Sequence, residues 1–389
     1  MRPTPALVTA LALSLAACSG GGGTSERSAP TTTTTAPPAE ARPVSRAELA
    51  AFADDLVADT GAEGGIVAWR VGDGEPVVVT AGVADARTGQ PLRPDDPFHV
   101  ASVTKSYVAA ALLSLEADGL VDLDAPIDEY VDWPGGEGIT TRQLLDQTSG
   151  VAGFPNGDED TTAYSELLQR DPPLTLDQTL AAARDLPPRG EPGEATSYGN
   201  LAYVLAGAVI EAATGEDVGT VLEERVFGPS DLQDTWYPPR GPGDAPPLPG
   251  VYEAEPGAPL LPTTAFDMET WRTVTAPASG AVSTVDDLLA WVDAALREQE
   301  VGGTDVSAMT AIGPGGYGLG VAGVSDEAGT CVFTGCPPGT EFRRWALNGD
   351  IPGASTRVFH DPATDATLVV VLNRNALELD RPMLAFLDA

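Results

Sequence analysis

Strand-like sequence patterns occur at both ends of this 389-residue chain, and helix-like patterns fill its middle. Near the start, two apolar runs at 65–71 and 76–82 are joined by Gly72-Asp73-Gly74, which is typical of a β-hairpin. The other strand-like runs come late in the chain, at 316–324, 342–347, 355–360 and 367–373. The sequence therefore predicts an α+β fold in which the N- and C-terminal parts form one antiparallel sheet flanked by helices.

Helical periodicity predicts a mainly helical region inserted between these parts, roughly at 119–275. Ser45 and Glu48 match a capping box, so a first helix is expected from there to about Asp59. The other expected helices cover 102–117, 141–147, 165–169, 176–183, 200–213, 286–296 and 383–387. A proline-dense stretch at 237–262 has no usable periodicity and is expected to be a loop.

The N-terminal segment has the features of an export signal. Arg2 is followed by a largely apolar run at 6–17, which is too short to span a bilayer. The run closes with Leu15-Ala16-Ala17-Cys18, and this resembles the bacterial lipoprotein signal, in which the cysteine is lipidated. The resemblance implies a signal peptide at 1–17 and an exported protein, anchored by a lipid on Cys18 to the outer face of the bacterial cell membrane. A plain secretory signal with an incidental cysteine is the alternative, and it also places the protein outside the cytoplasm.

Residues 18–44 are expected to be a disordered tether. From Ser19 to about Pro43 the chain consists mostly of Gly, Ser, Thr, Ala and Pro, and apart from proline it has no apolar side chain larger than alanine. Such a segment cannot bury enough apolar surface to pack. The folded domain is therefore expected to occupy 45–389.

The formal net charge of −36 excludes a large class of partners. With no basic stripe to displace counterions, nucleic-acid binding is not expected. A polybasic membrane surface is excluded in the same way, which leaves the lipid on Cys18 as the expected membrane contact. Acidity spread this evenly is read as a solubility device.

Two further cysteines, Cys331 and Cys336, lie five positions apart. In an exported protein, such a close pair is expected to form a disulfide that closes a local loop. Its role would be structural.

Ser102 and Lys105 form the strongest candidate for chemistry. Three positions apart at the start of an expected helix, they would lie on one face, close enough to exchange a proton. A serine hydroxyl becomes a good nucleophile only when a base removes its proton, and a desolvated neutral amine can do so. Lys105 is the only lysine among the 21 basic residues, and arginine cannot be deprotonated in a protein.

A second polar cluster, Tyr198-Gly199-Asn200, directly precedes an expected helix. A tyrosinate would be a strong base if a neighbouring cation lowered its pKa, and Lys105 would be such a cation.

Other chemistries fit poorly. The only histidines are His99, expected to be packed or near the site, and His360, expected at the surface. No G-x-S-x-G elbow and no cluster with metal-ligand spacing occurs, so neither metal nor cofactor is expected.

These motifs resemble those of the serine β-lactamase and penicillin-binding-protein superfamily, in particular its class C-like group. The resemblance covers nearly all of 45–389 and includes segments in the family's order: 82–85, 98–105, 119–126, 139–150 (ITTRQLLDQTSG), 198–200, 279–284 and 317–320. It implies a β-lactamase/transpeptidase-like fold and acyl transfer through an ester on Ser102. Lys105 would accept the serine proton, Tyr198 would pass a proton to the leaving group, and Asn200 would bond the acyl chain or Lys105. The Ser102 N–H would form half of an oxyanion hole.

The third motif of this family is altered here. Where the family has Lys or His, a small residue and Gly, this chain has Leu347-Asn348-Gly349, followed by Asp350. The resemblance places Asn348, Gly349 and Asp350 in the substrate site, with the second oxyanion N–H at Asp350. Losing the cation argues against substrates that carry a carboxylate, such as β-lactams. The arginines that could replace the cation from nearby positions are Arg343, Arg344 and Arg357.

Two functions are compatible with these motifs. The first is a serine hydrolase of esterase, amidase or D,D-peptidase type, acting on a small-molecule or peptide ester or amide, with β-lactamase activity less expected. The second is a non-catalytic binding or sensor module at the cell envelope, suggested by Leu347 and Asp350. Transfer to an amine instead of water would use the same residues.

Overall fold

The structure of the protein is a computed structural model that describes residues 41–153, 174–238, 247–252, 260–263, 274–375 and 378–389. The expected signal peptide at 1–17, most of the tether at 18–44 and the expected helix at 165–169 lie outside the described residues. Within the described part, no helix combines the length and the apolar character needed to cross a membrane.

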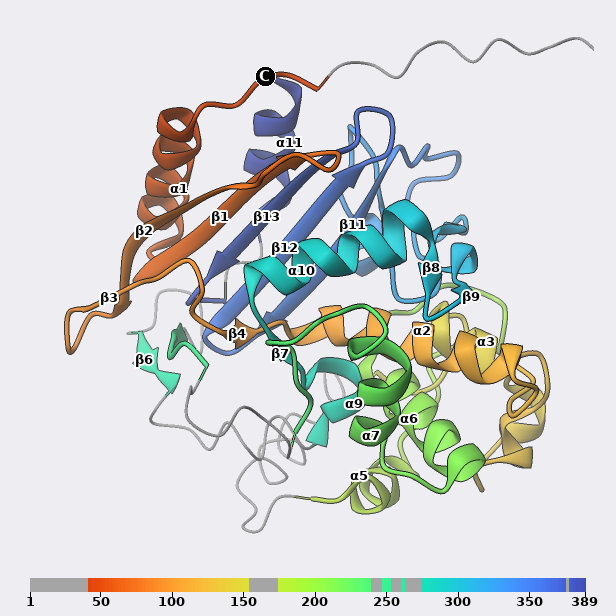
Figure 1. The fold of residues 1–389 in the computed structure, drawn as a ribbon. Helices are drawn as coiled ribbons and strands as arrows, with labels where there is room; N and C mark the ends of the chain where they lie inside the picture. Colours follow the sequence, from red (N-terminus) through yellow and green to blue (C-terminus); the bar gives the residue numbers. More distant parts are fainter. Residues whose placement is uncertain (1–40, 154–173, 239–246, 253–259, 264–273, 376–377) are drawn as a thin grey trace, which may run out of the picture. The chain divides into compact units, whose positions relative to one another are not determined.

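A seven-stranded sheet organises the fold, with the strand order β10-β11-β12-β13-β1-β2-β3 (Figure 1). The strands are β1 (Gly64–Val71), β2 (Val77–Asp85), β3 (Gln90–Pro91), β10 (Ala322–Val324), β11 (Arg344–Ile351), β12 (Ala354–Asp361) and β13 (Ala366–Leu372). All neighbouring pairs are antiparallel. The late strand β13 pairs with the early strand β1, with Val67 opposite Val370. The predicted sheet built from both ends of the chain is confirmed.

The two faces of the sheet bury different helices because successive side chains point to opposite sides of a strand. Along β13, Leu368 and Val370 belong to an apolar cluster with α1 (Arg46–Thr60) and α11 (Asp380–Asp388). Val369 and Val371 instead join the larger cluster, which contains residues of α2 (Thr104–Ala117) and α10 (Val285–Val292). Figure 1 shows these helix pairs on opposite sides of the sheet.

The remaining described helices lie mainly in the predicted insertion. They are α3 (Thr141–Leu145), α5 (Leu176–Ala183), α6 (Asn200–Thr214), α7 (Val218–Leu222) and α9 (Ala276–Ser279), with π-helical turns at Glu223–Phe227 and Asp293–Glu298. Short strand pairs join β4 (Phe98–His99) to β7 (Val282–Ser283), β5 (Val251–Tyr252) to β6 (Leu261–Pro262), and β8 (Glu300–Val301) to β9 (Thr304–Asp305). Ser45 caps α1 by accepting from the Glu48 N–H, whereas the Glu48 side chain pairs with Arg42.

Two predicted strands have different bounds in the structure. The run at 316–324 contributes only β10, because Gly318 donates its N–H to Val321 O and Gly320 takes φ +76°, which together make a turn. The run at 342–347 becomes β11 and extends to Ile351, so that the altered third motif is strand and not loop.

The expectation of a surface position for His360 is wrong. His360 is only 2% exposed. Its ring stacks on Trp345 across the β11–β12 pair, and its Nδ1 lies 3.0 Å from Thr367 Oγ1 of β13. A place within the sheet, with strands on both sides, buries the ring.

Candidate active site

Ser102 lies on a single 3-10 turn, Ala101–Val103, directly before α2. Ala101 has φ +49°, a left-handed conformation that side chains other than glycine seldom adopt. Strand β11 packs directly against this turn. A Cβ at Gly349 would lie 2.1 Å from Val100 O and 2.9 Å from the Ser102 nitrogen. The lack of a side chain at Gly349 therefore lets the strand backbone approach the N–H of the serine.

Lys105 is fully buried on the first turn of α2, one turn after Ser102. Its Nζ lies 3.0 Å from Ser102 Oγ, 2.7 Å from Asn200 Oδ1 and 3.0 Å from Ala278 O. Burial lowers the pKa of Lys105 well below its ordinary value, because the charged amine would lose its hydration. The predicted Ser102–Lys105 pair is thus brought together in a dry setting.

Tyr198 lies next to this pair. The Lys105 Nζ is 4.9 Å from the centre of the Tyr198 ring. Burial raises the pKa of Tyr198, and a hydrogen bond with the Ser102 side chain offsets this only in part. The expectation that Lys105 would lower the pKa of Tyr198 is wrong, because the burial that surrounds both groups also disfavours the charged lysine.

Asn200 begins α6 and is buried, with its Oδ1 on Lys105. The turn before it is held by Gln147, whose Oε1 accepts from the Gly199 N–H at 2.9 Å and whose Nε2 donates to Gly199 O at 3.2 Å. Gln147 was not predicted as a site residue, although it lies in a segment that resembles the family. Its left-handed φ of +65° is a signal only the structure supplies.

Leu347, which the resemblance places at the family's cation position, is only 1% exposed. Its side chain belongs to the larger apolar cluster, opposite Val358 of β12. The alternate residues Ala346 and Asn348 line the pocket that contains Ser102. The altered position therefore adds to the core and presents no charge to the site.

Asp350 is held by two partners. Ser355 Oγ donates to Asp350 Oδ1 at 2.6 Å, and Arg357 Nη2 pairs with Asp350 Oδ2 at 2.6 Å. Arg357 also donates to the carbonyl of Gly349 at 3.1 Å. The carboxylate charge beside the site is thus compensated.

None of the three candidate arginines lines this pocket. Arg357 is engaged with Asp350, Arg344 pairs with Asp361 at 3.0 Å, and Arg343 pairs with Asp326 at 3.3 Å. A replacement for the family's cation is therefore not supplied by them.

The pocket is narrow and partly aromatic. Its lining consists of Ser102, Tyr198, Tyr317, Gly320, Ala322, Phe333, Ala346 and Asn348. The Tyr198 ring has its centre 4.7 Å from that of Phe333 and 5.7 Å from that of Tyr317, both edge to face. Phe333 is 51% exposed, so the pocket has an apolar rim that was not predicted from the sequence.

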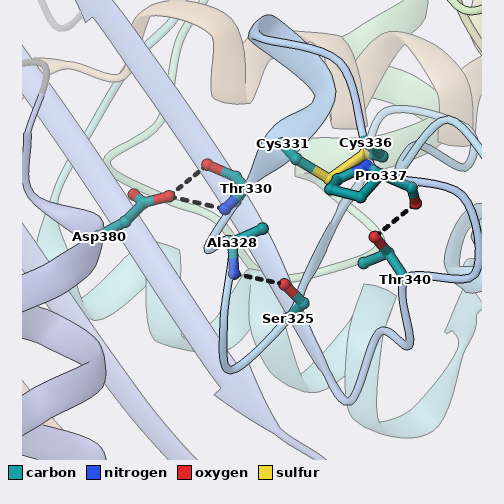
Figure 2. The surroundings of a disulfide bond; sticks show 8 residues. All are labelled: Ser325, Ala328, Thr330, Cys331, Cys336, Pro337, Thr340 and Asp380. Atoms are coloured by element: carbon teal, nitrogen blue, oxygen red, sulfur yellow. Dashed lines mark hydrogen bonds between the residues drawn. A yellow bond between two sulfur atoms is a disulfide. The ribbon is translucent and has the colours of Figure 1, made fainter.

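Phe333 belongs to the loop closed by the two expected cysteines. Cys331 and Cys336 form a disulfide in the structure, with their Cα atoms 4.9 Å apart (Figure 2). The preceding residue, Thr330, is bound by Asp380 at the start of α11. The loop is therefore restrained twice, by the disulfide that closes it and by the hydrogen bond from Thr330 to Asp380.

A group of carboxylates at the end of α2 and in the segment after it is engaged by an arginine. Among the described residues, Glu116, Asp122 and Asp124 lie close enough together to share an ion. Arg142 already pairs with Asp124 at 2.7 Å and with Glu116 at 3.2 Å. This cluster is therefore explained as an ion-pair network.

Comparisons with known proteins show what the chain is similar to. The family model described as Beta-lactamase matches residues 49–389. Esterase EstB of Burkholderia gladioli is 33% identical over 167 residues, which are 40% of this chain and 42% of that protein. D-aminopeptidase of Brucella anthropi is 31% identical over 191 residues, 48% of this chain and 35% of that protein. The chain thus matches less than half the length of these relatives.

A solved structure extends the likeness over most of the fold. The D-amino acid amidase from Ochrobactrum anthropi SV3, complexed with L-phenylalanine amide, has a TM-score of 0.71 and 25% sequence identity. The match covers 87% of this chain and 96% of that one.

Proposed function

Since the chain belongs to the beta-lactamase family over residues 49–389, we propose that it is a serine hydrolase that forms a covalent acyl-enzyme on Ser102. The observation that carries the proposal is the contact of a fully buried amine, Lys105, with Ser102 Oγ at 3.0 Å. The similar proteins named esterase, D-aminopeptidase and D-amino acid amidase support an ester or amide as the bond that is cleaved.

The neighbours of Lys105 suit a neutral amine, which has two N–H donors and one lone pair. Asn200 Oδ1 and Ala278 O can only accept, so they take the two hydrogens. The lone pair is left for the third neighbour, the Ser102 hydroxyl, which can donate. Lys105 is therefore placed to remove the serine proton as the oxygen attacks.

Acylation begins when Ser102 Oγ bonds to the carbonyl carbon of the substrate and its proton passes to Lys105. The backbone N–H groups of Ser102 and Asp350 stabilise the oxyanion, a role supported by the close approach of Gly349 to Ser102. As the bond to the leaving group breaks, Tyr198 donates its proton to that group and regains one from Lys105. Water cleaves the ester by the reverse transfers, which restores free Ser102.

The charge of the pocket bears on the substrate class. Leu347 is buried, and among the described residues the pocket lining contains no charged side chain. Small or peptide esters and amides without a recognition carboxylate fit best, whereas β-lactams and peptides ending in D-Ala-D-Ala lack their usual partner. One panel of esters, run beside a β-lactam, shows which of these substrates are cleaved. Transfer to an amine instead of water would use the same residues.

A non-catalytic binding module is the second candidate. It is favoured by Leu347 and by the engagement of Asp350 with Arg357, which remove the family's charge pattern from the third motif. It is opposed by the intact contacts among Ser102, Lys105 and Asn200.

Covalent labelling distinguishes the two candidates. The protein is incubated with a fluorophosphonate and with a fluorescent penicillin, and its intact mass is measured, with Ser102→Ala as the matched control. We expect a fluorophosphonate adduct on the wild type and none on Ser102→Ala. Failure of both reagents to label the folded wild type would instead support the binding module.

We also propose that the protein is exported and held at the outer face of the bacterial membrane by a lipid on Cys18. The support is the Leu15-Ala16-Ala17-Cys18 sequence and the Gly- and Ser-rich stretch after it. In a bacterial host fed radiolabelled palmitate, the wild type should carry label in the membrane fraction. Cys18→Ser should carry none, and equal labelling of both would contradict the proposal.

A further inference from the structure

Asn348 carries a polar atom whose partner is missing. The residue is 8% exposed and lines the same pocket as Ser102 and Tyr198. Within the described part of the chain, its buried Oδ1 has no hydrogen-bond partner. A buried carbonyl oxygen without a partner is costly, so this atom indicates a missing donor.

The other end of the Asn348 amide is engaged outside the pocket lining. Its Nδ2 donates to Thr330 Oγ1 at 3.1 Å. Thr330 does not belong to the residues that line the pocket. The nitrogen of the amide is therefore directed at Thr330, and its oxygen is the end without a partner among the described residues.

The direction of this amide is fixed by Asp380. Figure 2 shows the Asp380 carboxylate accepting from both the backbone N–H and the hydroxyl of Thr330. Because a carboxylate only accepts, the Thr330 hydroxyl must use its proton there. The Thr330 oxygen can then only accept a hydrogen bond from Asn348. The Nδ2 group is the donor of that amide, so it must be the end that faces Thr330. A flipped Asn348 would place two acceptors against each other.

Further contacts hold the two supporting residues. Arg357 Nε lies 3.8 Å from Asp380 Oδ1 and keeps a positive charge beside that carboxylate. Thr330 is followed at once by Cys331, which is tied to Cys336. The last helix and the disulfide loop thus set the orientation of an amide on β11.

We propose that Asn348 Oδ1 receives an N–H donor of the substrate, and that Thr330 and Asp380 are positioning residues that aim it. The substrate class is an ester or amide with an amide or ammonium N–H near the scissile carbonyl. This inference rests on the proposed serine hydrolase activity. On this proposal, the pocket selects a hydrogen-bond donor of the substrate and does not bind a carboxylate.

The test uses two pairs of substrates that differ only by NH or CH2. On the acyl side, the pair is the 4-nitrophenyl esters of N-acetylglycine and levulinic acid. On the leaving-group side, it is S-(2-acetamidoethyl) and S-(4-oxopentyl) thioacetate. Values of kcat/KM are measured for the mature full-length protein, with the Ser102→Ala rate subtracted as background. In at least one pair the N–H member should be favoured about tenfold, the size expected of one hydrogen bond between neutral groups.

Three variants identify the source of the preference. Asn348→Leu keeps the approximate shape and removes the acceptor, so the ratio within the pair should fall to about 1. Thr330→Val removes the hydroxyl that orients the amide and should lower the ratio to about 3, whereas Thr330→Ser retains the hydroxyl and should restore about 10. The ratio within a pair is unaffected by the amount of folded enzyme, so a partial loss of folding does not imitate this result.

Each outcome is informative. Equal rates for both members of both pairs in the wild type would overturn the inference and leave the serine hydrolase proposal standing. An undiminished tenfold preference in Asn348→Leu or in Thr330→Val would also overturn it; should Asn348→Leu not fold, the two Thr330 variants decide. Failure of every substrate to acylate Ser102, seen by intact mass, would overturn the proposed function and this inference together.

Discussion

Lys105 and Tyr198 are neighbours whose pKa values move in opposite directions. Burial lowers the pKa of the amine and raises that of the phenol. When an environment separates two titratable groups in this way, it favours one as the base and the other as the acid. The neutral amine is thus the better acceptor of the Ser102 proton, and the protonated phenol is the better donor to a leaving group.

The rate of Ser102 acylation is therefore expected to depend on the neutral form of Lys105. Above the lowered pKa the amine has a free lone pair and the rate is full; below it the amine is charged and the rate falls about tenfold per pH unit. Fluorophosphonate labelling rates from acid to alkaline pH give this profile.

Lys105→Arg is the matched control, because arginine keeps the charge and cannot become neutral. Its labelling rate should be lower by about a thousandfold at every pH. A variant that keeps a tenth of the wild-type rate, or a wild-type rate that rises toward acid pH, would contradict the role of Lys105 as base.

At the same scale, the sequence could predict only contacts that are local or rest on a shared motif. The three-residue spacing and the single lysine made Ser102 and Lys105 candidates without any coordinates, and the motifs shared with the family strengthened them. The orientation of Asn348 could not be predicted in this way, because it depends on Thr330 and Asp380, which come from two other parts of the chain.

Strand β11 shows how one element serves both the core and the site. Leu347 faces the larger apolar cluster, while Asn348 faces the pocket, as the two-residue period of a strand requires. The sequence pattern predicted this strand only as far as residue 347, and the three residues that follow, Asn348-Gly349-Asp350, are of types common in turns. In the structure β11 continues to Ile351, and the turn before β12 is made by Pro352 and Gly353, with Gly353 at φ +81°.

Gly349→Ala is expected to damage the site more than the fold. The added Cβ would lie 2.1 Å from Val100 O, so β11 and the Ser102 turn must move apart. The two proposed oxyanion donors would then separate, and acylation should fall by about a hundredfold or more. Fluorophosphonate labelling measures this loss, and the midpoint of urea unfolding reports stability.

Gly303→Ala is the control variant. It adds a side chain to a glycine that has a left-handed backbone but no close neighbour. Gly303 has φ +83° and no atom within 4 Å of an added Cβ. It should lose stability and keep the labelling rate. Equal labelling rates for both variants would show that the close approach at Gly349 does not matter.

On the scale of the whole molecule, the pairing of β1 with β13 joins the two ends of the described fold. The sequence could predict that both ends share one antiparallel sheet, because its strand patterns lie at the two ends and helical patterns lie between them. It could not predict which residues the assembled sheet would bury. His360 lies where β12 meets both β11 and β13, so its burial follows from long-range pairing and not from its own neighbours in sequence.

The burial of His360 should make the whole fold sensitive to acid. Burial lowers its pKa from 6.5 to about 4; the nearby Asp365 and Asp361 oppose this shift, and Arg297 and Arg70 favour it. Between these values the unfolded chain binds the proton more readily, so stability is full above pH 6.5 and lost as pH falls toward 4. The loss is roughly 3 kcal/mol. Urea unfolding gives the free energy of unfolding at each pH. The values for the wild type and for His360→Gln should converge as pH falls from 6.5 to 4. A constant difference between them would contradict the lowered pKa of His360.

The C-terminal helix α11 should stabilise the entire sheet through Phe386. This ring is 8% exposed, stacks on Phe52 of α1 with the ring centres 4.3 Å apart, and meets the edge of Trp69 of β1 at 6.0 Å. Phe386→Ala removes apolar contacts from two other elements at once, so we expect a loss of about 3–4 kcal/mol in urea unfolding.

Phe333→Ala is its counterpart, because that ring is 51% exposed and touches Tyr198 at the pocket. It should lose less than about 1 kcal/mol, since an exposed ring buries little apolar surface, yet it should change the rate of ester cleavage. Stability and activity should thus separate between two phenylalanines of one chain. If Phe386→Ala unfolds at the wild-type urea concentration, α11 is not the element that holds the joined ends of the chain together.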